Sequence, residues 1–224
     1  MHLRTTLLAA LLLAASSAFA QTIIVPGTSD LWLAGAPDGT VASGDDLAPA
    51  QSPALVSSIS GGSFYSFSVT GWVNNSAGAT SGPGPDGDIT VVISHADGAE
   101  NGISSLTAPI NSLIGVFTTG APPSSPGVDL VFGNAASLNF DSITPTLNQA
   151  FFIGDGLTST AQLQTFQAPT GASRLFLGTM DGYQWSNNSG EFKVTATAIP
   201  EPSTYAALCG VAALTIVVIR RRRK

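Results

Sequence analysis

The sequence predicts an all-β protein built as an antiparallel β-sandwich, and three observations lead to that prediction. Short runs of alternating apolar and polar residues recur between the two ends of the chain. Turn residues separate these runs: glycine, proline, asparagine and aspartate are frequent between them. No stretch before residue 203 has a sustained helical period. About eight short strands with such turns are typical of a β-sandwich.

Two segments alternate most cleanly, residues 63–70 and 191–199. Successive side chains of a strand point to opposite sides of the sheet, so the apolar residues of each segment share one face. We expect that face to pack on the core. The inward-facing residues are Tyr65, Phe67, Val69, Phe192, Val194, Ala196 and Ala198.

Shorter apolar runs predict the remaining strands. Segments 162–167 and 174–177 are expected to pair with each other across the turn at residues 168–171. One helical turn is expected near residues 106–113. The other predicted strands are residues 89–93, 113–117, 128–132 and 150–153, and the proline-rich segments 81–85 and 121–126 are predicted loops.

The first twenty residues have the three parts of a signal peptide. A short basic start, Met1 to Arg4, is followed by an apolar stretch and then by Ala18-Phe19-Ala20, a small-x-small cleavage pattern. The apolar stretch is too short to span a membrane. Cleavage is therefore expected between Ala20 and Gln21.

The end of the chain has the composition of a membrane anchor. Residues 203–219 carry no charge, and as a helix they would extend about 25 Å, a short but workable span for a hydrocarbon core of about 30 Å. The basic residues Arg220 to Lys224 follow and are expected to stay in the cytoplasm. The sequence therefore predicts one C-terminal transmembrane helix.

The triplet Pro200-Glu201-Pro202 stands directly before this segment. Two prolines prevent a regular helix and present an extended segment to an enzyme. The triplet, the apolar segment and the basic tail together resemble the PEP-CTERM sorting signal of Gram-negative bacteria. The resemblance implies processing by an exosortase, transient anchoring in the inner membrane, and delivery to the cell surface or the extracellular polysaccharide matrix of a biofilm. The expected domains are residues 1–20, 21–198 and 199–224.

The charge of the exported part excludes some partners. Between residues 21 and 202 all 14 acidic residues face only Arg174 and Lys193, a formal charge of −12. Such a surface argues against nucleic acid and anionic lipid, and it is compatible with divalent cations or neutral glycans. The only cysteine, Cys209, lies in the predicted anchor, so the exported part has no disulfide.

No pattern of catalytic residues stands out. Most aspartates precede glycine, as in Asp155-Gly156, and Asp-Gly is first a turn dipeptide. A Ser-His-Asp site would need His95, the only histidine of the exported part, and no nucleophile-elbow motif surrounds a serine. We expect that the protein is not an enzyme, although a glycan hydrolase stays open as a third class.

The stretch "LFLGTMDGYQWSNNSGEFKV", residues 175–194, has the most specific pattern of the chain. A strand ends at an Asp, and a loop, an Asn-Asn pair and Ser-Gly-x-Phe-x-Val follow. This order resembles the calcium loop of the galactophilic bacterial lectins, small β-sandwiches in which calcium bridges protein and galactose. The resemblance implies a sandwich of the jelly-roll or galactose-binding-like type. It also implies that calcium is bound by Asp181, the carbonyl of Gln184, Asn187 and Asn188.

A second stretch, "TGWVNNSAGATSGPGPDGD" at residues 70–88, resembles the other half of the same lectin site. The resemblance implies the carbonyl of Asn75 as a further calcium ligand. The loop from Asp181 to Asn187 is one residue shorter than in the lectins, and the histidine lies farther along the chain, so calcium transfers better than galactose. Residues expected to line the ligand site are Trp72, Asp86, Asp88, His95 and Trp185, with the two indoles near each other.

These observations leave two functions open. The first is an exported lectin-like protein that binds carbohydrate, with calcium as the cofactor. The second is a structural protein of the surface or matrix without a defined ligand, in which the Asp/Asn loop only stabilises the fold. Binding of glycans in calcium and in chelator would separate the two.

Overall fold

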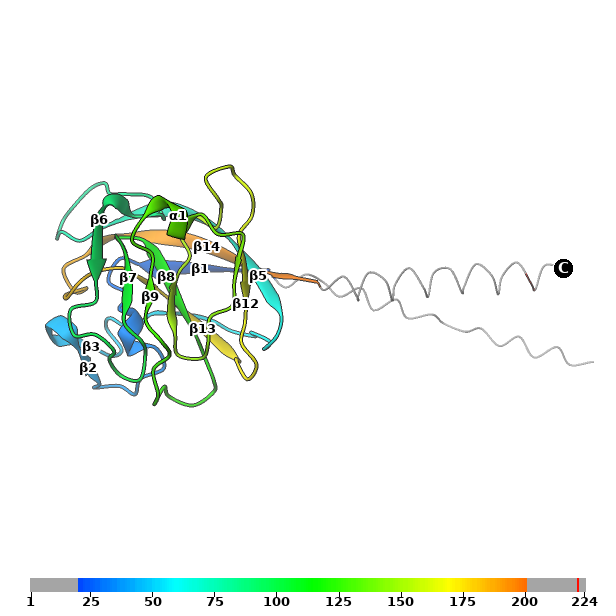
Figure 1. The fold of residues 1–224 in the computed structure, drawn as a ribbon. Coiled ribbons are helices and arrows are strands. Elements are labelled where there is room, and N and C mark those ends of the chain that lie inside the picture. The colour runs from blue at the N-terminus through cyan, green and yellow to red at the C-terminus, as the bar shows by residue number, and fades with distance from the viewer. Residues whose placement is uncertain (1–19, 201–220, 222–224) are drawn as a thin grey trace, which may run out of the picture. The chain divides into compact units, whose positions relative to one another are not determined.

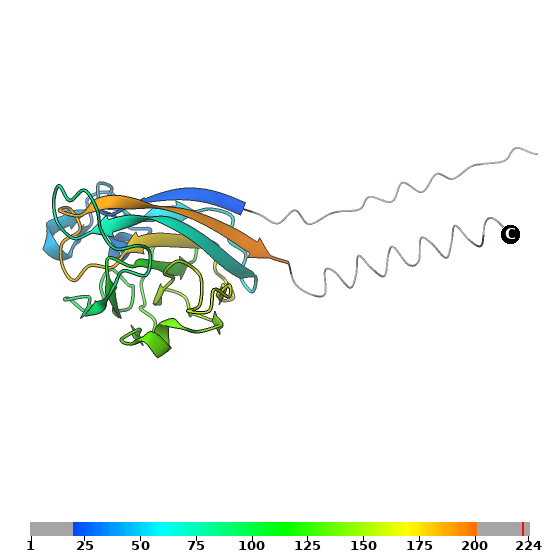
Figure 2. The same ribbon diagram turned by 90° about the horizontal axis from the view of Figure 1, so that it is seen from above.

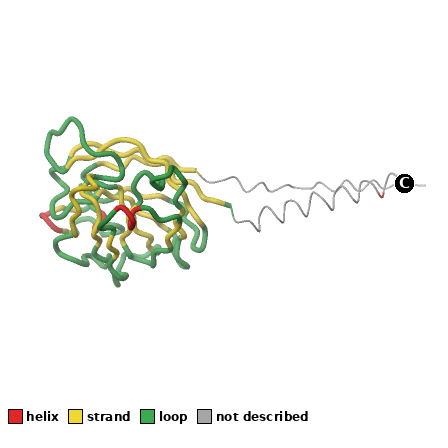
Figure 3. Tube along the Cα trace, turned by 45° about the horizontal axis from the view of Figure 1, so that its top comes forward, coloured by secondary structure: helices red, strands yellow, loops and turns green. Residues whose placement is uncertain are grey.

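The computed structural model describes residues 20–200 and Arg221 (Figure 1). One compact unit covers Phe19–Ile199. It is an all-β domain, and Figure 3 shows strands joined by many loops, with little helix. The strands are β1 (Ala20–Pro26), β2 (Val41–Ala42), β3 (Asp46–Leu47), β4 (Ala54–Val56), β5 (Phe64–Asn74), β6 (Asp88–Ser94), β7 (Leu106–Ile110), β8 (Leu113–Thr118), β9 (Leu130–Val131), β10 (Ser142–Ile143), β11 (Ala150–Phe152), β12 (Thr165–Gln167), β13 (Arg174–Thr179) and β14 (Ser189–Ile199).

Two sheets form the body of the domain. The larger has the order β1-β14-β5-β12-β10, and the second has the order β11-β8-β13-β4. Figure 2 shows β1, β14 and β5 side by side along one face, with β13 and β8 beneath them. Two smaller sheets, β6-β7-β9 and β2-β3, share no ladder with these two, although Leu106 and Ala108 of β7 belong to the same core. Most pairs are antiparallel, as predicted, but β10–β12 and β7–β9 are parallel.

The long ladder between β5 and β14 positions the loops discussed below. It pairs eleven residues of each strand, from Ser189 opposite Asn74 to Ile199 opposite Phe64. On its other side β14 pairs with β1, from Ala20 opposite Thr197 to Pro26 opposite Glu191. Both ladders therefore run from the two chain ends of the domain to the loops at the opposite end of the sheet.

One hydrophobic core joins the two sheets of the body. The predicted inward faces of β5 and β14 are confirmed, because Tyr65, Phe67, Val69, Phe192, Val194 and Ala196 are buried. Ala198 packs against the same core at its edge. Facing them are Phe117 of β8, Phe151 of β11 and Leu177 of β13, all fully buried. Removal of this apolar surface from water is the main stabilising term of such a domain.

Segments 162–167 and 174–177 do not form the predicted hairpin. β12 pairs with β5 in the larger sheet, whereas β13 pairs with β8 and β4 in the second sheet. The turn at residues 168–171 therefore carries the chain from one sheet to the other. Both segments contain strands, although β12 covers only the last three residues of 162–167. A short connection between two strands does not require them to be hydrogen-bonded neighbours.

The helical turn predicted near residues 106–113 is wrong, because this stretch forms β7 and the start of β8. The short helix of the domain is α1 (Ala135–Leu138), capped by Asn134. Pro109 in β7 lies opposite Val92, where the ladder with β6 is irregular, a position that tolerates the missing N–H. The strand predicted at 128–132 shortens to β9, and Val128 is exposed.

Three predictions fall on the chain ends. Cleavage after Ala20 would leave Gln21 to Pro26 of β1 in place, whereas Ala18 lies outside the described residues. The predicted transmembrane helix at 203–219 and the motif residues Glu201 and Pro202 also lie outside them, next to the described Pro200. Within the described part of the chain, no helix is long and apolar enough to cross a membrane.

Candidate metal centre

Two loops that are far apart in the sequence meet at the start of β14. The loop after β13, residues 180–188, carries the predicted ligand set, and the loop after β5 begins with Asn75. The Ser189 hydroxyl donates a hydrogen bond to the Ser76 carbonyl at 2.8 Å, which joins them. Because β5 and β14 are directly paired, the loop at Asn75 and the end of the loop of residues 180–188 lie at the same end of this ladder.

In the loop of residues 180–188, the side-chain nitrogens of both asparagines are hydrogen-bonded and their side-chain oxygens are not. The Asn188 amide nitrogen donates to the Gly27 carbonyl at 3.1 Å, and the Asn187 nitrogen donates to the Gln184 side-chain oxygen at 3.1 Å. A backbone carbonyl only accepts, so the Gly27 contact defines which end of the Asn188 amide is the oxygen. The Oδ1 atoms of Asn187 and Asn188 are buried and have no hydrogen-bond donor.

A third asparagine has the same property. Asn111, in the turn between β7 and β8, donates its amide nitrogen to the Asn75 side-chain oxygen at 3.2 Å, and its own Oδ1 is buried without a donor. Its backbone N–H donates to the Met180 carbonyl, next to Asp181. Three amide oxygens thus lack a donor in one region of the domain, and leaving a buried acceptor unpaired costs about 1–3 kcal/mol each.

Asp181 supplies the carboxylate of this cluster. Burial raises the pKa of Asp181, more than the hydrogen bonds from the Gly182 amide and the Asn188 side chain lower it. Asp46, another carboxylate in this region, raises it further. A partly desolvated carboxylate in a region where amide oxygens lack donors is an environment that a cation would stabilise.

The chemistry of these groups fits calcium. Calcium takes six to eight oxygen ligands, including carboxylates, amide oxygens and backbone carbonyls. The structure links the predicted ligand residues in pairs, Asn188 with Asp181 and Asn187 with Gln184, while the Asn75 side chain is bonded to Asn111. No group of three or more histidine, cysteine, aspartate or glutamate residues that could hold a metal occurs among the described residues. The predicted ligand set itself consists of one carboxylate and otherwise neutral oxygens.

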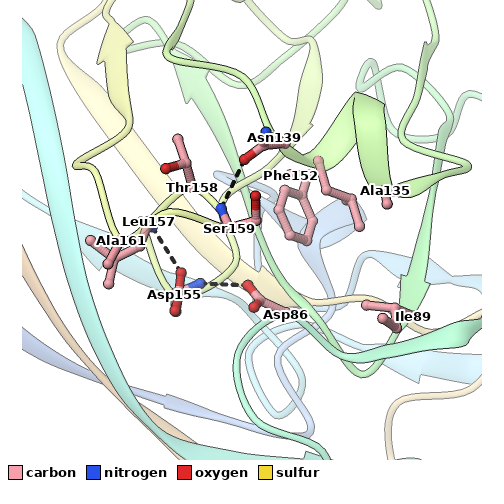
Figure 4. A pocket seen from close by; sticks show the side chains of 11 residues that line it. Asp86, Ile89, Ala135, Asn139, Phe152, Asp155, Leu157, Thr158, Ser159 and Ala161 are labelled. Carbon is pink, nitrogen blue, oxygen red and sulfur yellow. Dashed lines mark hydrogen bonds between the residues drawn. The ribbon is translucent and has the colours of Figure 1, made fainter.

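Asp86 and Asp88 do not join this cluster. Asp86 accepts a hydrogen bond from the Asp155 amide at 2.9 Å and lines a separate pocket of about 390 Å³, shown in Figure 4. Although much of the residue is exposed, partial burial of its carboxylate raises its pKa. Asp88 accepts hydrogen bonds from the side chain and the backbone of Thr90, which lower its pKa. Among the described residues, no hydrogen bond joins either carboxylate to Asn187 or Asn188, although Asp88 pairs with Ile110, the residue before Asn111.

His95 is a buried structural residue, and this corrects its predicted role as a ligand contact. Its ring stacks on Trp32 at 3.7 Å between centroids and is 3% exposed. Its Nε2 lies 2.9 Å from the Glu100 carboxylate, which also accepts a hydrogen bond from the Ser43 hydroxyl. A side chain enclosed in this way cannot reach a sugar at the surface.

Trp185 also differs from its prediction. It is fully buried and contacts Trp32, while its indole N–H donates to the Thr179 carbonyl at 2.8 Å. Its backbone N–H and that of Ser186 donate to the Asp46 carboxylate, which anchors the loop. Trp72 is partly exposed on β5 beside Gly190. The two indoles therefore do not form an exposed pair that could stack on a sugar.

The chain was compared with known proteins. No family of proteins, no curated protein and no solved structure matches it.

Sequence reasoning missed Asn111 and Asp30. Asn111 lies outside both stretches that resemble the lectin site, and its one local signal is an Asn-Ser pair directly after an apolar strand. Asp30 is fully buried and caps the turn at Leu31–Leu33 by accepting from the Trp32 amide at 2.9 Å. Burial raises the Asp30 pKa well above its ordinary value, and nearby Asp46, Glu100 and Asp181 add to this. An isolated Asp after a serine gives no sign of such a position.

Proposed function

We propose that this protein is an exported, exosortase-sorted surface or matrix protein that binds carbohydrate through a calcium ion. The exported domain would be a galactose-binding-like β-sandwich, preceded by a cleaved signal peptide and followed by a PEP-CTERM anchor. Calcium would be held by Asp181, Asn187 and Asn188 together with the carbonyls of Gln184 and Asn75. Hydroxyl groups of a neutral glycan would complete its shell.

One observation carries the metal part of this proposal. The Asn187 and Asn188 oxygens are buried without donors beside a carboxylate whose pKa is raised by burial. A bound calcium ion would supply the missing partner for each of these groups at once. The formal charge of −12 in residues 21–202 would also concentrate cations near the surface.

A second candidate function is favoured by the burial of Trp185 and His95. If neither side chain reaches a ligand, calcium could serve only to tie the loop of residues 180–188 to the loop at Asn75. The protein would then be a structural component of the polysaccharide matrix. Sugar binding, measured after calcium binding, distinguishes this role from the lectin-like one.

Calorimetric titration of the purified full chain with calcium tests the metal site. We expect one calcium per chain and a higher melting temperature in calcium than in chelator. The Asp181→Ala variant should lose this calcium effect and match the wild type in chelator. Asp88→Asn is the control, because it removes a carboxylate bonded only to Thr90. Equal loss of stability in both conditions for Asp181→Ala would identify Asp181 as a turn residue.

A glycan array probed in calcium and again in chelator tests the carbohydrate part. Binding that depends on calcium and on Asp181 supports the lectin-like function. Calcium binding without any glycan signal would favour the structural role. Release of shorter glycans from the same array would instead indicate a hydrolase.

A further inference from the structure

Asn111 lies beside the candidate metal centre in a third loop, and a hydrogen bond to Met180 places it there. β8 and β13 pair from Arg174 opposite Thr118 to Thr179 opposite Leu113. Beyond this ladder, the Met180 amide donates to the Ser112 carbonyl at 2.8 Å, and the Asn111 amide donates to the Met180 carbonyl at 2.7 Å. Met180 is thus bonded to two consecutive residues of the other segment, as in a β-bulge, and Asn111 is held against the residue that precedes Asp181.

The amide of Asn111 is held with its oxygen free. Its nitrogen donates to the Asn75 side chain, its Oδ1 has no donor, and the residue is 3% exposed. The backbone is left-handed, with φ of 66°. Glycine would adopt this conformation more readily and would bury no polar atom. Backbone geometry alone therefore does not account for an asparagine at this position.

We infer that the Asn111 side-chain oxygen is an additional calcium ligand. This inference rests on the calcium site of the proposed function. With Asn111, the protein would offer four side chains and two carbonyls, about six oxygens in all, to an ion that takes six to eight. At most about two positions then remain for water or sugar hydroxyls. Asn111 also orients Asn75, so one residue contributes a ligand and fixes the loop that carries another.

Terbium luminescence and calcium calorimetry on the full chain test this assignment. Terbium replaces calcium at oxygen sites, and its lifetimes in light and heavy water count the bound water molecules. Asn111→Ala should weaken calcium binding roughly tenfold or more and admit one additional water to the terbium ion. Asn111→Asp keeps an oxygen ligand and adds charge, so it should bind calcium more tightly than the wild type without the additional water.

Asn148→Ala is the matched control. Asn148 is also left-handed, with φ of 60°, and its side chain also donates to a neighbouring loop, at the Ser125 carbonyl. It should lose stability in chelator without a change in calcium affinity. Melting temperatures in chelator show whether each variant is folded. If Asn111→Ala does not fold, the calcium affinity and water count of Asn111→Asp test the inference.

Two results would overturn the inference. Unchanged calcium affinity in both Asn111 variants would exclude the oxygen as a ligand. Weaker binding of Asn111→Ala with an unchanged water count would mean that Asn111 acts only by positioning Asn75. In either case Asp181-dependent calcium binding would still support the proposed function. Absence of calcium binding by the wild type would instead remove the proposed function and this inference together.

Discussion

Asparagine has two roles in the loops of this domain. At Asn148 it adopts a left-handed turn at a partly exposed position. At Asn111, Asn187 and Asn188 it carries an oxygen that is buried without a donor. Three such oxygens together destabilise the domain by several kcal/mol, at about 1–3 kcal/mol each, unless a partner is bound. A cation that stabilises the folded state at this site would therefore act on the least satisfied polar groups of the loops.

The network around His95 leads to a prediction at the scale of one carboxylate. Burial alone would raise the pKa of Glu100, but hydrogen bonds from His95 and Ser43 lower it overall. A lowered pKa means that ionised Glu100 stabilises the fold above its unfolded pKa and that this contribution disappears as the pH falls through the folded value.

Glu100→Gln should therefore destabilise the domain by about 1 kcal/mol near neutral pH, since the group is partly exposed. Below the Glu100 pKa the variant and the wild type should become nearly equal in stability. Urea denaturation at several pH values measures this difference. Exposed Asp38→Asn is the control and should change little. A loss that stays constant with pH would show that charge at Glu100 is unimportant.

At the scale of the strands, close packing between β5 and β14 leaves no room for a side chain at Gly190. Gly190 has φ of 85°, and a Cβ at this position would overlap the backbone and the indole of Trp72. Gly39 has nearly the same φ, 87°, but no atom lies within 4 Å of its would-be Cβ. Alanine substitutions at Gly39 and Gly190 therefore separate the cost of a left-handed backbone from the cost of steric overlap.

Gly39→Ala should cost about 1 kcal/mol, the price of a left-handed alanine. Gly190→Ala should cost more than about 3 kcal/mol, because the strands must also move apart. Chemical denaturation of both variants measures the difference. Similar losses for the two would indicate that β14 can shift without cost.

Strands were predictable from the sequence where apolar and polar residues alternated over a long segment. Their hydrogen-bonded partner strands were not predictable. Residues 63–70 and 191–199 gave the correct inward faces, since one buried face imposes a period of two. Residues 162–167 and 174–177 were also strands, yet each entered a different sheet. Alternation reports which face is buried, whereas pairing depends on how distant segments pack.

The same limit applies to the candidate metal centre. Asp181, Asn187 and Asn188 lie within one loop, so a local pattern can propose them together. Asn111 is connected to this loop by the hydrogen bond from its amide to the Met180 carbonyl, a contact between distant segments that only the folded chain shows. His95 and Trp185 were misassigned because an aromatic ring in the sequence gives no sign of whether it is buried.

At the scale of the whole domain, β1 closes the larger sheet at its edge. It pairs with β14 over seven residues and places Val25 in the core. A chain trimmed to residues 21–199 should keep the calcium response and the cooperative unfolding of the full chain. A chain trimmed to residues 28–199 should unfold or aggregate, because β14 would become an exposed edge.

Circular dichroism and size-exclusion chromatography of the two trimmed chains measure this outcome. The shorter chain also lacks the Gly27 carbonyl that orients Asn188, so any folded fraction should bind calcium weakly. A stable, monomeric 28–199 fragment would show that β1 is dispensable.

The pairing of Ala20 with Thr197 has a practical consequence for handling the protein. Both chain ends leave the domain where β1 begins and β14 ends, while the asparagine loops lie at the start of β14, ten residues away along one extended strand. A strand of that length covers roughly 30 Å. A biosensor surface, fluorescent tag or affinity matrix attached after Ile199 would therefore be joined to the end remote from the loops and should leave them open to soluble glycans.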